Sequence, residues 1–262
     1  MIKLIATDMD GTLLNDKGQL PTDFAAIFSQ LKDKKIIFAA ASGRQYFSLR
    51  ETFLSVSEDV LFIAENGTLI MYKGEELYFN PLEKEHVSEL LSIAKTLNNA
   101  YPVLCGKKSA YIESTDPRLV GEVEKYYAKY KIVDNLQDVE DDVLKLSICD
   151  FTDAETNANS AFSPLYSDKL QVTVSGKMWL DMTHKTASKG TAIKYIQEKF
   201  AIGYEQTMVF GDYFNDVTLL QSAFYSYAME NAHPDVKKYA RFNAQSNNKE
   251  GVIQVIKKVL NH

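Results

Sequence analysis

Short apolar runs alternate with segments of helical spacing at both ends of this chain, and this alternation constrains the fold more than any other feature. Ile2–Ala6, Ile36–Ala41 and Leu61–Ala64 have the length and composition of buried strands. Residues 24–31 place apolar side chains on one face of a helix, and late in the chain Thr207–Phe210 is another buried run. Strands that are joined through helices form a parallel sheet, because each helix is a crossover connection.

The middle of the chain interrupts this alternation. After Pro81, short strand candidates such as Tyr101–Cys105 and Val143–Ile148 mix with amphipathic helices, a pattern typical of an α+β domain. We therefore predict an α/β core made of residues 1–81 and 187–262, and an inserted α+β domain made of residues 82–186. The length of 262 residues is consistent with one large or two modest domains.

Composition excludes several classes of protein. The 29 Lys and Arg residues against 35 Asp and Glu residues give a net charge of −6 with no basic stripe, so we expect neither nucleic acid nor a membrane surface as the main partner. Cys105 and Cys149 are far apart, which excludes a disulfide framework. The N-terminus does not resemble a signal peptide, and the longest apolar run, Ile36–Ala41, is too short to span a bilayer. We expect a cytoplasmic protein, and the sequence leaves its oligomeric state open.

Polar residues follow two of the predicted strands. Asp8-Met9-Asp10-Gly11-Thr12 comes directly after the first run, and its two carboxylates repel each other unless a cation or a proton lies between them. Ser42-Gly43-Arg44 follows the second run, and we expect it to open a helix and offer an anion site. Taken singly, the first segment could be a solvated turn and the second a simple helix N-cap.

Two further polar segments lie late in the chain. Ser188-Lys189-Gly190 begins a predicted helix, where a lysine opposes the helix dipole unless an anion lies beside it. Gly211-Asp212-Tyr213-Phe214-Asn215-Asp216 follows the run Thr207–Phe210. Alone, the first could be a surface lysine and the second a turn with an N-cap. In parallel sheets, however, ligands bind beyond the carboxyl ends of the strands, so the four segments are expected to share one edge.

Together, these four segments resemble the motifs of the haloacid dehalogenase (HAD) superfamily, and the long insert resembles that of its Cof-like sugar-phosphate phosphatase branch. The resemblance covers nearly the whole core, whereas the insert is similar only in length and position. It implies a Rossmann-like parallel-sheet core with an inserted α+β cap domain over the site. It also implies a small phosphorylated molecule as substrate, in particular a sugar phosphate.

The resemblance further implies a Mg²⁺-dependent phosphatase that acts through an aspartyl-phosphate on Asp8, with Asp10 as general acid and base. Asp8, Asp10 (through its backbone carbonyl) and Asp212 would bind Mg²⁺, and Asp216 would lie behind these ligands. The residues implied for phosphate binding are Met9, Thr12, Ser42, Gly43, Lys189 and Asn215. Charge counting also favours a cation, since four carboxylates and a phosphate would face the single charge of Lys189.

The chain departs from the family pattern at two places. Tyr213 stands where the family usually has glycine, which makes the rim of the site bulkier. The stretch Thr183–Ala187 lacks the usual Gly-Val before Ser-Lys-Gly. Two other functions are compatible with the motifs: a phosphomutase that passes the phosphoryl group to another sugar, and a non-enzymatic module that binds a phosphorylated ligand. The adjacent pair Asp8 and Asp10 argues against the module, because simple binding gains nothing from two repelling carboxylates.

Overall fold

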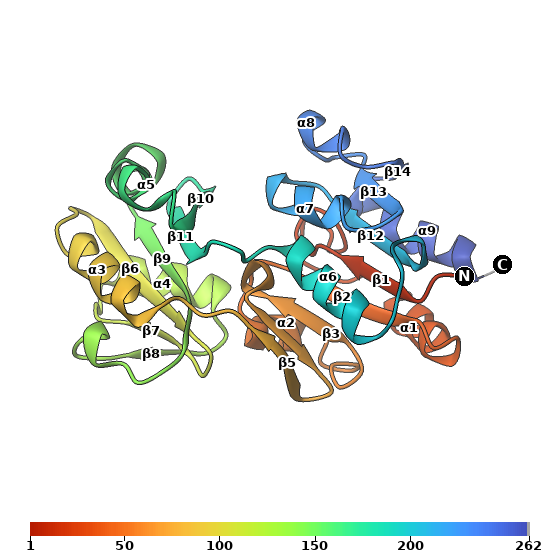
Figure 1. Cartoon of the computed structure of the whole chain (residues 1–262), viewed down its shortest axis with the longest axis horizontal. Helices are drawn as coiled ribbons and strands as arrows, with labels where there is room; N and C mark the ends of the chain where they lie inside the picture. The colour runs from red at the N-terminus through yellow and green to blue at the C-terminus, as the bar shows by residue number, and fades with distance from the viewer. Residues whose placement is uncertain (261–262) are drawn as a thin grey trace. The chain divides into compact units, whose positions relative to one another are not determined.

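The computed structural model describes residues 1–260, and the chain divides into two compact units. The first unit combines Met1–Tyr78 with Ser188–His262, and the second is Phe79–Ala187. The division lies three residues before the expected start of the insert at residue 82. Asn80 belongs to the second unit, where its amide donates a hydrogen bond to the Thr186 hydroxyl (3.1 Å). Figure 1 shows the insert in yellow and green, and the elements of the first unit in red to orange and in cyan to blue.

The first unit is built on one sheet, with the strand order β14-β13-β12-β1-β2-β3-β4-β5. Neighbouring strands from β14 to β3 run parallel, and β4 pairs antiparallel to β3. The strands are β1 (Leu4–Thr7), β2 (Ile37–Ala41), β3 (Leu61–Ala64), β4 (Leu69–Tyr72), β5 (Glu75–Phe79), β12 (Thr207–Gly211), β13 (Tyr225–Met229) and β14 (Phe242–Ala244). The predicted α/β fold with a parallel-sheet core is confirmed.

Helices cover both faces of this sheet, which explains why its central strands are apolar throughout. On one face, Ala6 and Val209 pack in the same cluster as Ile193 of α6. On the other face, Phe38 packs against Phe24 of α1, with ring centroids 5.3 Å apart. The helices of this unit are α1 (Phe24–Asp33), α2 (Tyr46–Thr52), α6 (Lys189–Lys199), α7 (Val217–Leu220), α8 (Pro234–Lys237) and α9 (Gly251–Leu260).

The second unit is an α+β domain around a six-stranded sheet of order β10-β11-β9-β6-β7-β8. Its neighbouring strands are antiparallel, except that β7 and β8 run parallel. Leu146 and Ile148 face one apolar cluster with helices α3 and α5, while Cys149 faces another with α4. The elements are α3 (Lys84–Ala94), β6 (Ala100–Gly106), β7 (Ala110–Ile112), α4 (Pro117–Tyr126), β8 (Tyr130–Ile132), β9 (Val143–Asp150), α5 (Ser160–Tyr166), β10 (Leu170–Gly176) and β11 (Trp179–His184). Within residues 1–260, no helix has the length and apolar character that a membrane span requires.

Candidate active site

The parallel register places the ends of three strands at one edge of the sheet. Thr7, the last residue of β1, lies opposite Ala40 of β2 and Phe210 of β12. Asp8 comes next, and its backbone N–H donates to the Phe210 carbonyl (3.0 Å). Met9 follows with a fully buried side chain that anchors the loop in the core. The loops that begin with Asp8, Ser42 and Asp212 therefore leave the sheet side by side.

Lys189 lies at the centre of this edge. Its side chain is fully buried, and Nζ donates to Oδ1 of Asp8 (2.6 Å) and to Oδ1 of Asp216 (2.7 Å). Ser188 caps α6 by accepting the Thr191 backbone N–H (3.0 Å), which fixes Lys189 as the first residue of the helix. Burial disfavours the charged amine, but the attraction of Asp216 and Asp8 outweighs it and raises the pKa of Lys189. Lys189 is therefore a fixed cation.

Three carboxylates surround this amine. One oxygen each of Asp8, Asp212 and Asp216 lies within 4.8 Å of the others, and the Thr12 hydroxyl donates to Oδ1 of Asp212 (3.1 Å). Burial, together with the charge of Asp216, raises the pKa of Asp8 well above its ordinary value, although Lys189 opposes this shift. Burial and the same neighbour raise the pKa of Asp212 to about 6.

The charges of this cluster do not balance. Three carboxylates against one ammonium leave a formal charge of −2, and all the donors other than Lys189 are oxygen atoms. Hard divalent cations such as Mg²⁺ bind carboxylate oxygens, and a nearby cation removes the repulsion that raises the carboxyl pKa values. The residues present therefore fit a magnesium ion.

Asp216 also orders the loop that carries Asp212. Its Oδ2 accepts the backbone N–H groups of Asp212 (2.9 Å) and Tyr213 (3.2 Å), so both carboxylate oxygens of Asp216 are engaged. Gly11 approaches the same loop at φ +76°, where an added Cβ would lie 2.3 Å from Oδ2 of Asp212. Asn231 holds Gly11 in place by donating to its carbonyl (2.7 Å).

The carboxylate of Asp10 points to a different partner. Arg44 donates two hydrogen bonds to it: Nε donates to Oδ2 (2.8 Å), and a terminal nitrogen donates to Oδ1. The Asp10 side chain is 59% exposed and that of Arg44 is 29% exposed. The Asp10 carboxylate is therefore ion-paired at the surface, whereas that of Asp8 is buried against Lys189. No role for Arg44 was predicted from the sequence. Its position directly after Ser42-Gly43, in a segment expected at the site, is the signal that could have indicated one.

Asn66 connects the loop after β2 to the loop after β12. Its Oδ1 accepts a hydrogen bond from Nδ2 of Asn215 (3.1 Å), and its backbone N–H donates to the Ser42 carbonyl (2.9 Å). The Ser42 hydroxyl accepts the Arg44 N–H (3.1 Å). Helix α2 begins only at Tyr46, so the expectation that Ser42-Gly43-Arg44 opens a helix directly is wrong. This segment instead forms a tight loop held by Asn66.

The turn Glu65–Gly67 packs tightly around this loop. Asn66 adopts a left-handed conformation (φ 56°), which asparagine tolerates better than most residues. A Cβ on Gly43 would lie 3.0 Å from Nδ2 of Asn66, and one on Gly67 would lie 2.3 Å from the carbonyl oxygen of Ser188. Gly67 is therefore needed for the close approach of this turn to the start of α6, whereas Gly43 lies tightly against the Asn66 amide. An Asn-Gly pair is an ordinary hairpin signal, and the sequence pattern alone does not indicate its contacts with Ser42 and Ser188.

Two aromatic side chains border the loop after β12. Tyr213 and Phe214 are 55% and 49% exposed, and the Phe214 ring lies 4.7 Å from that of His233. The tyrosine that replaces the usual family glycine thus lies at the surface. It leaves the contacts of Asp212 and Asp216 in place.

Comparison with known proteins gives a consistent picture. The haloacid dehalogenase-like hydrolase family matches residues 5–256. The chain belongs to this family. It is 33% identical to the 5-amino-6-(5-phospho-D-ribitylamino)uracil phosphatase YbjI of Escherichia coli, over all of this chain and 97% of that protein. It is 24% identical to the phosphatase YcsE of Bacillus subtilis, which has the same named activity, over 98% of this chain and 95% of that one. The structure of SMU.1108c from Streptococcus mutans superposes with a TM-score of 0.90 at 30% identity, with full coverage of both chains.

Membership of this family makes the chain a hydrolase, and its relatives are phosphatases. The resemblance that the sequence motifs indicated is therefore confirmed. The structure brings the predicted residues Asp8, Thr12, Lys189, Asp212 and Asp216 into direct contact, whereas the Asp10 carboxylate lies in a separate ion pair.

Proposed function

We propose that the chain hydrolyses phosphate monoesters of small molecules through an aspartyl-phosphate on Asp8, and that it requires Mg²⁺. The observation that supports this proposal is the buried contact of Lys189 with both Asp8 and Asp216, next to Asp212. Burying a charged lysine among carboxylates carries a desolvation cost, and ionisable groups in such surroundings cluster at functional sites. A transferring phosphoryl group, whose oxygens carry spread negative charge, is the substrate that such a cation stabilises.

Each residue has a distinct task in this proposal. Asp8 attacks phosphorus with a carboxylate oxygen, and Lys189 orients that carboxylate and favours its ionised form. Ser42, Asn215 and the backbone N–H groups of Met9 and Gly43 contact the phosphoryl oxygens. Asp10 donates a proton to the leaving oxygen and later accepts one from water, for which it must part from Arg44. Thr12 holds Asp212 in position.

Magnesium fits the acidic cluster in this proposal. The carboxylates of Asp8 and Asp212, with the backbone carbonyl of Asp10, would hold the ion, and Asp216 would keep the Asp212 loop and Lys189 in place. When bound, Mg²⁺ supplies positive charge that offsets the repulsion between this cluster and a phosphate dianion.

For the substrate class, we propose a small molecule with a phosphorylated sugar or sugar-alcohol chain. Two relatives are named for a substrate with a phospho-D-ribitylamino group, and one of them is 33% identical over the whole chain. The sequence resemblance to sugar-phosphate phosphatases supports the same class. Both indications have in common a phosphate ester on a polyhydroxylated carbon chain.

A phosphate-release assay tests the proposal. Purified protein is incubated with p-nitrophenyl phosphate and a panel of sugar, sugar-alcohol and nucleotide phosphates, with Mg²⁺ or with EDTA. We expect turnover with Mg²⁺, the fastest rates on sugar or sugar-alcohol phosphates, and none in EDTA. Asp8→Asn is expected to abolish turnover, while Asp33→Asn, at an exposed site on α1, is the matched control. Retained turnover by Asp8→Asn would reject the covalent route, and transfer to an added sugar instead of water would indicate a mutase.

A further inference from the structure

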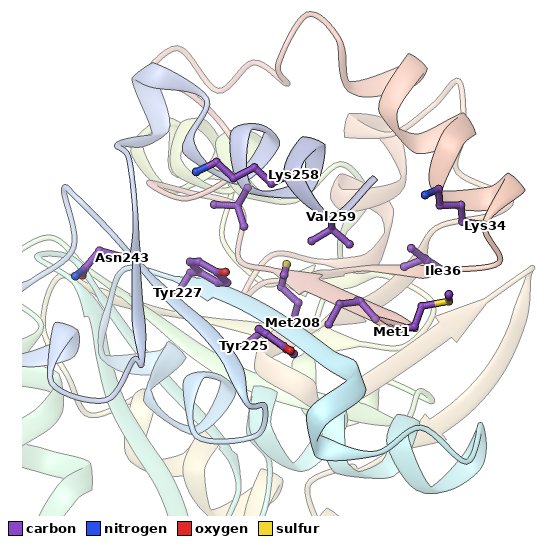
Figure 2. A pocket seen from close by; sticks show the side chains of 11 residues that line it. Met1, Lys34, Ile36, Met208, Tyr225, Tyr227, Asn243, Lys258 and Val259 are labelled. Carbon is purple, nitrogen blue, oxygen red and sulfur yellow. The ribbon is translucent and has the colours of Figure 1, made fainter. Parts of the chain in front are cut away.

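A cavity lies near the opposite edge of the core sheet. Its volume is about 730 Å³, and it opens near the amino ends of the parallel strands, whereas the candidate active site follows their carboxyl ends. Figure 2 shows Met208, Tyr225 and Tyr227 on the sheet side, with Lys258 and Val259 projecting from α9. None of the lining residues within 1–260 belongs to the candidate active site.

The inner wall of this cavity is apolar. Met208, Ile36 and Val255 line it and are each less than 10% exposed, so they come from the packed core. The Tyr227 ring stacks between Phe210 and Phe242, at centroid distances of 5.1 and 5.2 Å, and is thereby held rigidly. Rigid ring and thioether surfaces favour a flat aromatic ligand, because aromatic pairs and sulfur–aromatic contacts add to the burial of apolar area.

The polar groups around the cavity are cations and neutral donors. Lys34 and Lys258 line it, and among residues 1–260 no carboxylate belongs to the lining, although the whole chain has a net charge of −6. Lys34 already donates to the Leu260 carbonyl (2.6 Å). The ammonium of Lys258 and the hydroxyls of Tyr225 and Tyr227 have no hydrogen-bond partner within residues 1–260. Burial raises the pKa of Tyr227, so its hydroxyl stays protonated and can donate.

We propose that this cavity is a binding site for a small aromatic carboxylate. The aromatic ring would lie between the sheet residues Met208 and Tyr225 and the α9 residue Val259, and the carboxylate would pair with Lys258. The volume lies in the range of about 300–1,000 Å³ that is typical of small-molecule sites, which are mostly apolar with a few polar groups. The proposal is independent of the function assigned to the acidic cluster.

Calorimetric titration of the full chain with 1-naphthoate, and with its neutral analogue 1-naphthamide, tests the proposal. We expect 1-naphthoate to bind more tightly than the amide. Lys258→Gln should weaken 1-naphthoate about two- to fivefold, the scale of a partly exposed ion pair, and leave the amide unchanged. Lys257→Gln is the matched control, since its amine pairs with Asp23 (2.9 Å) outside the cavity lining.

A cavity-filling substitution provides an independent check. Val259→Trp is expected to abolish binding of both compounds, while its circular-dichroism melt shows that the protein folds. The proposal is overturned if 1-naphthoate gives no heat at millimolar concentration, if it binds no better than the amide, or if Lys258→Gln leaves its affinity unchanged. Unaltered binding by a folded Val259→Trp protein would also overturn it, because the compound would then bind elsewhere.

Discussion

Replacement of Lys189 by methionine removes the one ammonium that touches both buried carboxylates while keeping the length of the side chain. The side chains of Lys189, Asp216 and Asp8 are 0%, 0% and 8% exposed, so water cannot replace the lost contacts. Breaking one partner out of a buried ion pair costs about 3–5 kcal/mol. At about 2–4 °C per kcal/mol for a chain somewhat smaller than this one, the melting temperature should fall by about 6–20 °C.

The loss must also depend on pH, and its sign follows from Asp8. Its pKa in the folded protein is already raised above 3.8, and Lys189 opposes the rise, so Lys189→Met raises it further. A raised folded pKa contributes stability that is complete below the unfolded pKa and is lost as pH rises through the folded pKa. The variant should therefore lose less stability near about pH 4, where the raised pKa keeps Asp8 protonated, than near about pH 8.

Urea unfolding of both proteins in EDTA, at these two pH values, measures the effect. Lys194→Met is the matched control, because Lys194 is an exposed lysine of the same helix α6 and should change stability by less than about 0.5 kcal/mol. A loss below about 1 kcal/mol at the higher pH, or an equal loss at both values, would refute the reasoning. Either result would mean that the buried cluster does not depend on the lysine charge.

Three further outcomes are expected. Mg²⁺ should bind at least about tenfold more weakly at about pH 5 than at about pH 8 by calorimetry, because the Asp212 carboxyl has a pKa of about 6 and must ionise to bind, and the raised pKa of Asp8 acts in the same direction. Equal affinity at the two pH values would exclude Asp212 as a ligand. Gly67→Ala should lower the free energy of unfolding in urea by about 2–4 kcal/mol, because the new Cβ would clash with Ser188. Gly121→Ala is the control: it adds a Cβ into open space in α4, so it should be neutral or stabilising. Similar values for the two variants would contradict this expectation. Arg44→Met should change the free energy of unfolding by less than about 1 kcal/mol, because the ion pair of Arg44 with Asp10 is partly exposed. The variant should raise the KM for p-nitrophenyl phosphate, and an unchanged KM would place the guanidinium outside the site.

The core could be predicted because its information is local. Runs such as Ile37–Ala41 and Thr207–Gly211 are apolar on both faces, and the polar segments that follow them lie at one edge whenever the strands are parallel. Strand β14 (Phe242–Ala244) was missed, since it is short and its side chains are largely exposed. In the insert, β11 was missed as a strand. The parallel pairing of β7 with β8 was not predicted either, because the sequence of neither strand indicates its partner or direction.

The site could be predicted as a list of residues but not as a set of contacts. The ion pair of Asp10 with Arg44 joins an exposed and a half-buried side chain 34 positions apart, and neither residue type indicates the other as its partner. The contact of Asn66 with Asn215 spans 149 positions and depends on a left-handed turn. Such contacts follow from tertiary packing, and neither sequence spacing nor residue type determines them.

The central position of β1 has a consequence for how the protein is made. Leu4 pairs with Ile37 on one side and with Thr207 on the other. One edge of β1 therefore stays unpaired until β12, about 200 residues downstream, has been synthesised. At about 5–20 residues per second, a ribosome needs about 10–40 s to supply it. Throughout that interval the nascent chain carries an open apolar strand edge, while the entire insert can emerge and fold. During translation, this half-finished sheet therefore exposes an unpaired strand edge of the kind that makes folding intermediates prone to aggregate.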